Sequence, residues 1–278
     1  MTESAVATLL FVDGPTPRLL AGVRWTGNER TDAALFASTD GGDSWTPWDD
    51  GLALENDGSF WAFSLAEDPA VAGRLYMGSS ASILRSDDAG ANWRFVFNNA
   101  DAGGPGINSI VVKDDGASIW AGGGSALGVG RVIRSTDSGS TWEVLFPTGF
   151  GEFPVRSVLI EPMNPTRLWL GMWGTVEGAP VMWSDDGGTT WVPSLSEPVL
   201  ISALVAGPDG SLYAVGGRPE PSDDGAPAGL YVYRRSHGDE WTQLETPPDA
   251  GWGASAIVTS DGHLMVGTVG TGIWRVPL

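Results

Sequence analysis

The stretch Ser38–Trp45 reads STDGGDSW, and the same pattern recurs three more times in the chain. The other copies are SDDAGANW (Ser86–Trp93), STDSGSTW (Ser135–Trp142) and SDDGGTTW (Ser184–Trp191). We call these four stretches the repeat segments. Their first serines lie 48, 49 and 49 residues apart (86−38, 135−86 and 184−135). A decayed fifth copy is expected from Ser236 to Trp241. A constant period of about 50 residues indicates that one structural unit is repeated along the chain.

Four short runs surround each repeat segment, and each run is either apolar throughout or alternating, which is typical of β-strands. In the fifth repeat these runs, named A to D in chain order, are ISALVAG, SLYAVGG, GLYVYRRS and WTQLET. Six runs of type A are present: VATLLFV, WAFSLAE, INSIVVK, VRSVLIE, ISALVAG and SAIVTS. The sequence therefore predicts an all-β fold, a single six-bladed β-propeller. Its blades are four-stranded and antiparallel, with the repeat segments between strands C and D.

The predicted propeller forms one domain over residues 1–278. Its blades are expected at approximately 6–53, 54–100, 101–150, 151–197, 198–247 and 248–278. The last blade supplies only three strands of its own. We expect residues 2–5 to add its outer strand, because an unpaired sheet edge at the end of the chain would otherwise remain open.

The repeat segments resemble Asp-boxes, also called BNR repeats, and four well-preserved copies make the resemblance specific. Asp-boxes occur in sialidases, xyloglucan-cleaving glycosidases, sortilin-type receptors and photosystem II assembly factors. The resemblance covers nearly the whole chain and implies a propeller, but it does not choose among these functions. In each repeat segment the aspartate is expected to accept hydrogen bonds from its own turn, and the tryptophan is expected to pack between sheets.

Composition excludes several kinds of partner and site. The formal net charge of −19 repels phosphate groups and anionic lipids, so neither nucleic acid nor a membrane is an expected partner. The chain has no cysteine, which excludes disulfides, thiolate zinc sites and cysteine nucleophiles. We expect no metal and no cofactor. The first residues lack a basic segment, so a cytoplasmic location is expected, or secretion if a signal peptide was removed.

The connections of the predicted blades fall into two kinds. The A–B turns and the repeat segments are short and regular, whereas the B–C and D–A connections at the opposite, loop end are long and irregular. Because variable loops on a rigid scaffold tend to carry binding residues, we expect a ligand funnel at this loop end. The candidate ligand-binding residues there are Arg24, Trp25, Trp61, Asn108, Arg156, Trp173, Arg218 and Trp252.

The types of these residues indicate the ligand. Indole rings would stack on sugar rings or other flat ligands, and arginines would bind a carboxylate or another anionic group. Arg156 opens the innermost strand of the fourth blade and is the expected central anion contact. The alternative is that Arg156 forms an ion pair with Glu152. The other arginines would then pair with loop carboxylates such as Glu29, Asp32, Glu220 and Asp223, and ordinary loop packing would explain about half of the tryptophans.

Catalytic constellations are sparse in the sequence. The only histidines, His237 and His263, are expected at the end opposite the loops, which leaves no histidine-based triad for the loop end. An inverting glycosidase needs two carboxylates ~6.5–9.5 Å apart. The loop-end carboxylates to test for such a role are Asp57, Asp101, Glu152 and Glu177. Solvated acidic loops explain these four equally well.

Three functions follow from these observations. The first is a binding propeller that recognises a small molecule, a glycan or a protein segment at the loop-end funnel. The second is a glycoside hydrolase-like enzyme that uses paired carboxylates. The third is an acidic assembly scaffold for a protein partner, which the negative charge favours.

Overall fold

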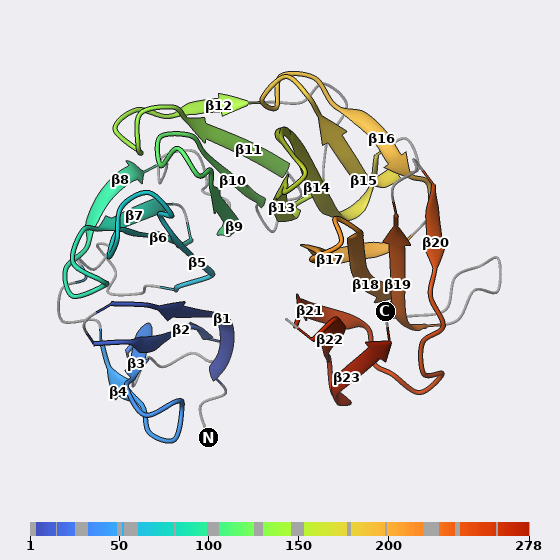
Figure 1. Ribbon diagram of the computed structural model, residues 1–278, viewed down its shortest axis with the longest axis horizontal. Coiled ribbons are helices and arrows are strands. Elements are labelled where there is room, and N and C mark those ends of the chain that lie inside the picture. Colours follow the sequence, from blue (N-terminus) through green and yellow to red (C-terminus); the bar gives the residue numbers. More distant parts are fainter. Residues whose placement is uncertain are drawn as a thin grey trace. The chain divides into compact units, whose positions relative to one another are not determined.

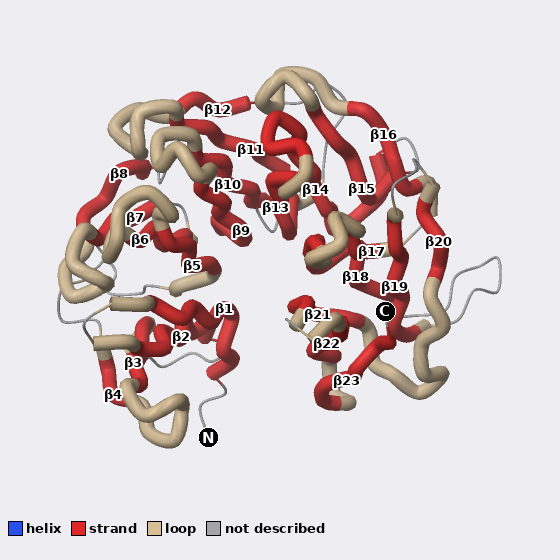
Figure 2. Tube along the Cα trace, viewed as in Figure 1, coloured by secondary structure: helices blue, strands red, loops and turns tan. Residues whose placement is uncertain are grey.

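The computed structural model describes residues 4–14, 16–25, 33–48, 52, 61–80, 82–98, 106–124, 130–145, 153–176, 179–197, 199–218, 228–236, 240–259 and 261–277. These residues form strands, turns and connections, with no helix among them (Figure 2). The described part of the chain accordingly contains no helix long and apolar enough to cross a membrane.

The strands form six antiparallel sheets in which neighbours in sequence are neighbours in space (Figure 1). Sheet 1 contains β1 (Ser4–Val12), β2 (Arg18–Trp25), β3 (Leu35–Ser38) and β4 (Thr46–Pro47). Sheet 2 contains β5 (Ser64–Glu67), β6 (Leu75–Gly78), β7 (Ser82–Ser86) and β8 (Arg94–Asn98). Sheet 3 contains β9 (Gly106–Val112), β10 (Ile119–Gly124), β11 (Gly130–Ser135) and β12 (Glu143–Leu145).

The other three sheets repeat this order. Sheet 4 contains β13 (Val155–Glu161), β14 (Asn164–Val176), β15 (Ala179–Ser184) and β16 (Val192–Leu195). Sheet 5 contains β17 (Leu200–Ala206), β18 (Leu212–Arg218), β19 (Gly229–Arg235) and β20 (Trp241–Gln243). Sheet 6 has three described strands, β21 (Gly253–Val258), β22 (His263–Thr268) and β23 (Gly272–Pro277). The chain divides into two compact units, of which the first holds sheets 1 to 3 and the second holds sheets 4 to 6.

The N-terminal strand differs from the expectation that residues 2–5 complete the last sheet. Ser4 pairs with Trp25 and Ala5 pairs with Arg24, so both residues belong to β1 of sheet 1. The reason is that the eight residues of β2 pair with eight of the nine residues of β1, with a register shift between Val6 and Thr8, so that the pairing extends to Ser4. Residues 2 and 3 lie outside the described part of the chain.

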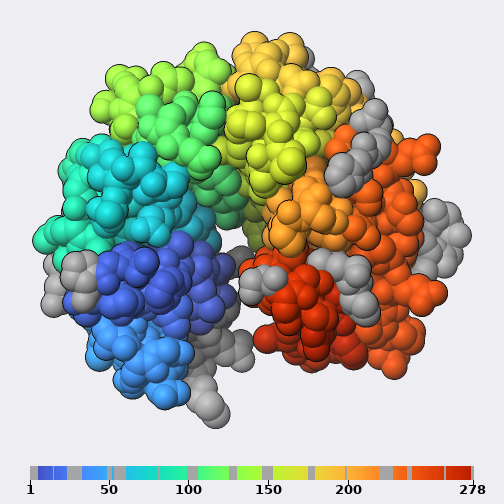
Figure 3. All heavy atoms as spheres, in the orientation of Figure 1, coloured from blue at the N-terminus to red at the C-terminus, as the bar shows by residue number. Residues whose placement is uncertain are grey.

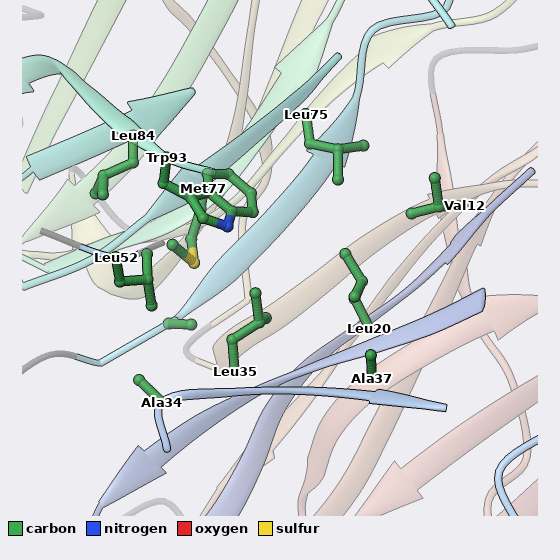
Figure 4. Close-up of a cluster of buried hydrophobic side chains, with 11 residues drawn as sticks. Val12, Leu20, Ala34, Leu35, Ala37, Leu52, Leu75, Met77, Leu84 and Trp93 are labelled. Atoms are coloured by element: carbon green, nitrogen blue, oxygen red, sulfur yellow. The ribbon is translucent and has the colours of Figure 1, made fainter. Parts of the chain in front are cut away.

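Apolar side chains fill the spaces between successive sheets within each unit. Between sheets 1 and 2, Leu20 and Leu35 pack with Leu75, Met77 and other buried residues (Figure 4). In the space-filling view the atoms of these two sheets lie directly against each other (Figure 3). Burying each such side chain contributes about 1.5–3 kcal/mol, so the stacked faces supply the main stabilisation of the fold.

Glycines in the second strands allow the next sheet to approach closely. A Cβ atom on Gly78 of β6 would lie 2.6 Å from the carbonyl oxygen of Ile107 in sheet 3. A Cβ atom on Gly171 of β14 would lie 2.6 Å from the Ile201 side chain in sheet 5. At the first of these contacts the Ile107 N–H donates to the Ser79 carbonyl at 2.8 Å, which links sheets 2 and 3 through the backbone.

The repeat segments lie between the third and fourth strands of sheets 1 to 4, and each is organised around its first serine. In the third segment Ser135 is 2% exposed; its Oγ donates to Asp137 (2.8 Å) and accepts from the Gly139 N–H (2.9 Å). Asp137 accepts from the backbone N–H and the hydroxyl of Thr141. The closing tryptophan donates from Nε1 to a glycine carbonyl at 2.9–3.1 Å in all four segments. These polar groups are therefore occupied within their own turns.

The register of sheet 5 corrects the position of the decayed copy. In sheets 1, 2 and 4 the first serine of the repeat segment pairs with a leucine of the second strand, as Ser86 pairs with Leu75. In sheet 5 the corresponding Leu212 pairs with Arg235. Arg235 therefore occupies the position of the first serine, one residue before Ser236, where the copy was expected to begin.

Candidate functional site

Three of the predicted ligand-binding residues come together in the second unit. Arg156 lies in β13, Trp173 lies in β14, and Trp252 directly precedes β21. The Trp173 and Trp252 rings are stacked, with centroids 5.6 Å apart and an interplanar angle of 28°. The Arg156 Cζ lies 5.1 Å from the centroid of the Trp173 ring. We call these three residues the aromatic cluster; they come from sheets 4 and 6.

The backbone around Trp173 holds its ring in place. The Trp173 N–H donates to the Pro154 carbonyl at 3.0 Å, which ties the end of β14 to the start of β13. The next residue, Gly174, has a φ of 143°, and a side chain there would overlap the Phe153 ring. Only glycine fits this position, because it alone combines such a φ with the absence of a Cβ atom.

Trp252 is fixed by sheets 5 and 6. A Cβ atom on Gly217 of β18 would lie 2.6 Å from the Trp252 Cβ, so the missing side chain at Gly217 makes room for Trp252. The Trp252 carbonyl accepts from the Val269 N–H at 3.1 Å. The indole is therefore positioned by contacts to a neighbouring strand and to its own sheet.

The arrangement restricts what each ring can do. The Trp173 ring contacts both a guanidinium and a second indole, and its Nε1 is buried with no hydrogen-bond partner among the described residues. Trp252 is half-buried. Among the described ring contacts, its only partner is Trp173. Cation–π and stacking interactions contribute about 0.5–1.5 kcal/mol each, and here they order the two indoles. Of the two half-buried indoles, Trp252 has the fewer described ring contacts.

Arg218 is placed differently from the cluster. Arg218 is 7% exposed, and its Cζ lies 5.7 Å from the centroid of the Tyr231 ring in the same sheet. Burial also raises the pKa of the nearby Tyr233 hydroxyl, to about 12. A buried guanidinium beside buried tyrosines has a packing role in sheet 5. The expectation that Arg218 contacts ligand therefore stays a prediction.

Two other candidates lie in the first unit. Trp61 packs edge-on against Phe63, with centroids 5.8 Å apart and an interplanar angle of 75°. Asn108 is half-buried in β9. Their part in a ligand site stays a prediction.

The remaining candidates cannot be placed as side chains. Arg24 and Trp25 are described only as backbone at the end of β2. The carboxylates proposed for a hydrolase lie outside the described residues, as does the proposed partner of Arg156: they are Asp57, Asp101, Glu152 and Glu177. The paired-carboxylate mechanism and the Arg156–Glu152 ion pair therefore stay predictions. Among the residues that the structure does describe, no group of His, Asp or Glu side chains is arranged to hold a metal ion.

The residues that shape the cluster were not singled out from the sequence. Phe153, Gly174 and Gly217 position the two indoles, yet none carries chemistry of its own. The usable signal is the glycine directly after a tryptophan, as in Trp173–Gly174, because glycine inside a strand often marks a bulge or a close approach of another group.

No protein-family model matches the sequence, and no curated protein matches it. Several solved structures are similar. A GH74 enzyme from Niastella koreensis is 17% identical with a TM-score of 0.74, over 96% of this chain and 41% of its own length. A GH74 xyloglucanase from Xanthomonas campestris is 18% identical with a TM-score of 0.67, over 99% of this chain and 47% of its own. YCF48 bound to D1 peptide is 16% identical with a TM-score of 0.62, over 98% of this chain and 84% of its own.

At these identities the similarity shows the fold alone. It confirms the predicted class, an all-β, six-bladed β-propeller with antiparallel blades. The chain spans less than half the length of the GH74 structures. The similar structures include glycoside hydrolases and a peptide-bound protein, so the fold supports more than one kind of function.

Proposed function

We propose that this chain is a glycan-binding propeller that stacks a sugar ring on Trp252. The observation that carries the proposal is the stack of Trp173 and Trp252 at 5.6 Å, with the Arg156 guanidinium over Trp173. The C–H face of a sugar ring packs well on an indole, whose two rigid χ angles cost little entropy on binding.

Preorganisation of the aromatic cluster supports binding. Trp173 contacts Arg156 and Trp252, so the second indole is held before any ligand arrives. A ring that is already ordered loses little conformational freedom when a ligand docks, and this raises affinity.

The similarity to xyloglucanases suggests the first glycan to test. A titration of the purified chain with xyloglucan oligosaccharides, followed by calorimetry, measures binding directly. Trp252→Ala should weaken binding at least tenfold, about 1.4 kcal/mol, because the stacking surface is lost. Trp45→Ala is the matched control, since Trp45 is 37% exposed in a repeat segment and lies in the other unit. Equal affinity of the wild type and Trp252→Ala would contradict the proposal.

The hydrolase alternative is separated by a second readout on the same samples. A binding propeller leaves the oligosaccharide intact, so no new reducing ends should appear during prolonged incubation. Release of reducing ends that is lost in Asp57→Asn, Asp101→Asn, Glu152→Gln or Glu177→Gln would establish the enzyme instead.

A further inference from the structure

Six Asp–Gly steps lie in the part of the chain that the structure describes. They are Asp13–Gly14, Asp40–Gly41, Asp115–Gly116, Asp186–Gly187, Asp209–Gly210 and Asp261–Gly262. At such a step the backbone nitrogen of the glycine can attack the side-chain carboxyl carbon of the aspartate. Because glycine has no Cβ atom, its nitrogen approaches without hindrance. Whether the reaction occurs in the folded chain depends on what else binds these two groups.

The reaction reroutes the backbone in two steps. In the first, a bond forms between the glycine nitrogen and the carboxyl carbon, and the N–H proton and the carboxyl hydroxyl leave together as water, which gives a cyclic succinimide. In the second, water attacks the main-chain carbonyl carbon of the ring and breaks its bond to the nitrogen. The product is isoaspartate, whose backbone runs through the side-chain carbon atoms. The water consumed balances the water released, so no other reagent is needed.

In five of the six steps the aspartate carboxylate is held by a serine or a threonine. It accepts from the hydroxyl of Ser44 for Asp40, Ser118 for Asp115, Thr190 for Asp186, Ser211 for Asp209 and Thr259 for Asp261. In the first four of these, the backbone N–H of the same serine or threonine also donates to the carboxylate. These bonds must open before the glycine nitrogen can attack.

The glycine nitrogen is engaged as well in three of these five steps. Each of the three N–H groups donates to a backbone carbonyl earlier in its own turn, at 2.8–3.0 Å. The pairs are Gly116 with Lys113, Gly210 with Gly207, and Gly262 with Thr259. In these turns both reacting groups are therefore bonded to other partners.

Asp13 and Gly14 differ from the other steps because they bond to each other. The Gly14 N–H donates to Asp13 Oδ1 at 2.8 Å, which is the one hydrogen bond that this carboxylate makes among the described residues. The attacking nitrogen is thus held beside the carboxyl group that it would attack, and such proximity lowers the entropic cost of reaction. A Cβ atom on Gly14 would meet no other atom within 4 Å, so the described neighbours leave room around this step.

We propose that Asp13 is a modification site, at which the folded chain converts aspartate to isoaspartate through a succinimide with Gly14. The step lies in the turn that joins β1 to β2, just beyond the pair formed by Val12 and Arg18 (Figure 1). The additional backbone carbon of isoaspartate therefore enters a turn and leaves the paired strands of sheet 1 in register. This site belongs to the first unit and goes beyond the proposed function, which concerns the second.

Incubation of the full chain at neutral pH in water labelled with heavy oxygen tests the proposal. Each passage through the succinimide adds one heavy oxygen, and mass spectrometry with electron-transfer fragmentation, after digestion in ordinary water, identifies isoaspartate in each peptide. A parallel incubation in guanidinium chloride gives the rate at each step without structure. Asp13 should isomerise at least as fast in the folded chain as in denaturant. The other five described steps should react about tenfold more slowly, or less, when folded, because they require local opening.

Two variants of Asp13 separate the chemistry from the position. Asp13→Glu keeps the charge but would have to form a larger, six-membered ring, so isomerisation at this position should stop while the melting temperature stays unchanged. Asp13→Asn forms the same succinimide with loss of ammonia and should react faster than the wild type.

Three results would overturn the proposal. The first is a rate at Asp13 that folding suppresses as strongly as at the other five steps. The second is a folded-state rate at any of those five that equals the rate at Asp13. The third is a folded Asp13→Asn chain that forms no isoaspartate at this position, because the turn would then prevent ring closure.

Discussion

At the residue scale, the repeat segments depend on a buried serine more than on the aspartate that makes them recognisable. Ser135 is 2% exposed and bonds three groups of its turn, whereas Asp137 is exposed. Ser135→Ala should lower the free energy of unfolding by about 1–3 kcal/mol, because the buried Gly139 N–H loses its acceptor. Urea denaturation measures this. Thr136→Ala, an exposed neighbour, should unfold like the wild type, and a similar loss in both variants would contradict the assignment.

The aspartates of the repeat segments make stability depend on acid pH. Hydrogen bonds from Thr141 lower the pKa of Asp137 from 3.8 to about 2. For Asp186, burial raises the pKa, but hydrogen bonds from Thr190 outweigh it and bring the pKa to about 2. Because the folded pKa lies below the unfolded one, this stabilisation is complete above about pH 4 and is lost as pH falls through about 2.

The Asp137→Asn variant isolates this contribution. Its free energy of unfolding should change less steeply between pH 4 and pH 2 than that of the wild type, since one group with a lowered pKa is removed. Urea titrations at several pH values in this window give the slope. Identical slopes for the two proteins would show that Asp137 is not protonated differently on unfolding.

At the element scale, glycine in the second strand sets the distance between sheets. A Cβ atom on Gly78 would come within 2.6 Å of the Ile107 carbonyl, which is backbone and cannot move aside easily. Gly78→Ala should therefore cost about 1–3 kcal/mol of stability, measured by thermal or urea unfolding. Met77→Leu, a change of similar volume at the neighbouring buried position, serves as the control and should cost less. A Gly78→Ala protein as stable as the wild type would show that the sheets can separate at no cost.

The strands and their order could be predicted from the sequence because each element carries a local signal. Alternation gives the strands, the spacing of the repeat segments indicates a repeated unit, and the six runs of type A give the number of sheets. The register of the strands is harder to predict from the sequence. In sheet 5, Arg235 takes the place of the first serine instead of Ser236, and only its pairing with Leu212 shows this. The placement of residues 4 and 5 also depended on pairing, because their apolar run suits either sheet.

The aromatic cluster could be predicted in part. Arg156, Trp173 and Trp252 were chosen because they lie at loop ends, and the structure brings these three together. Which of these side chains contact one another could not be predicted, because Trp252 lies far in sequence from the other two and no local pattern indicates such contacts. Arg218 is buried with its guanidinium over Tyr231, and its role as a ligand contact stays a prediction.

At the scale of the whole molecule, the residues that stabilise the six sheets differ from the residues proposed to bind a ligand. The repeat segments use their polar groups within their own turns, so they stabilise the sheets. The aromatic cluster lies near strand ends and next to loops. The amino-acid sequence of such regions varies most among proteins that share a fold. The GH74 structures are more than twice as long as this chain, so their activity does not transfer with the fold.

The most direct test of the binding proposal is a crystal structure of the chain soaked with a xyloglucan oligosaccharide. The account predicts electron density for a sugar ring stacked on the Trp252 indole, with Trp173 and Arg156 in the positions described. The same soak of Trp252→Ala crystals should show no sugar at this place. Density for the oligosaccharide against the repeat segments, with the Trp252 ring bare, would contradict the proposal.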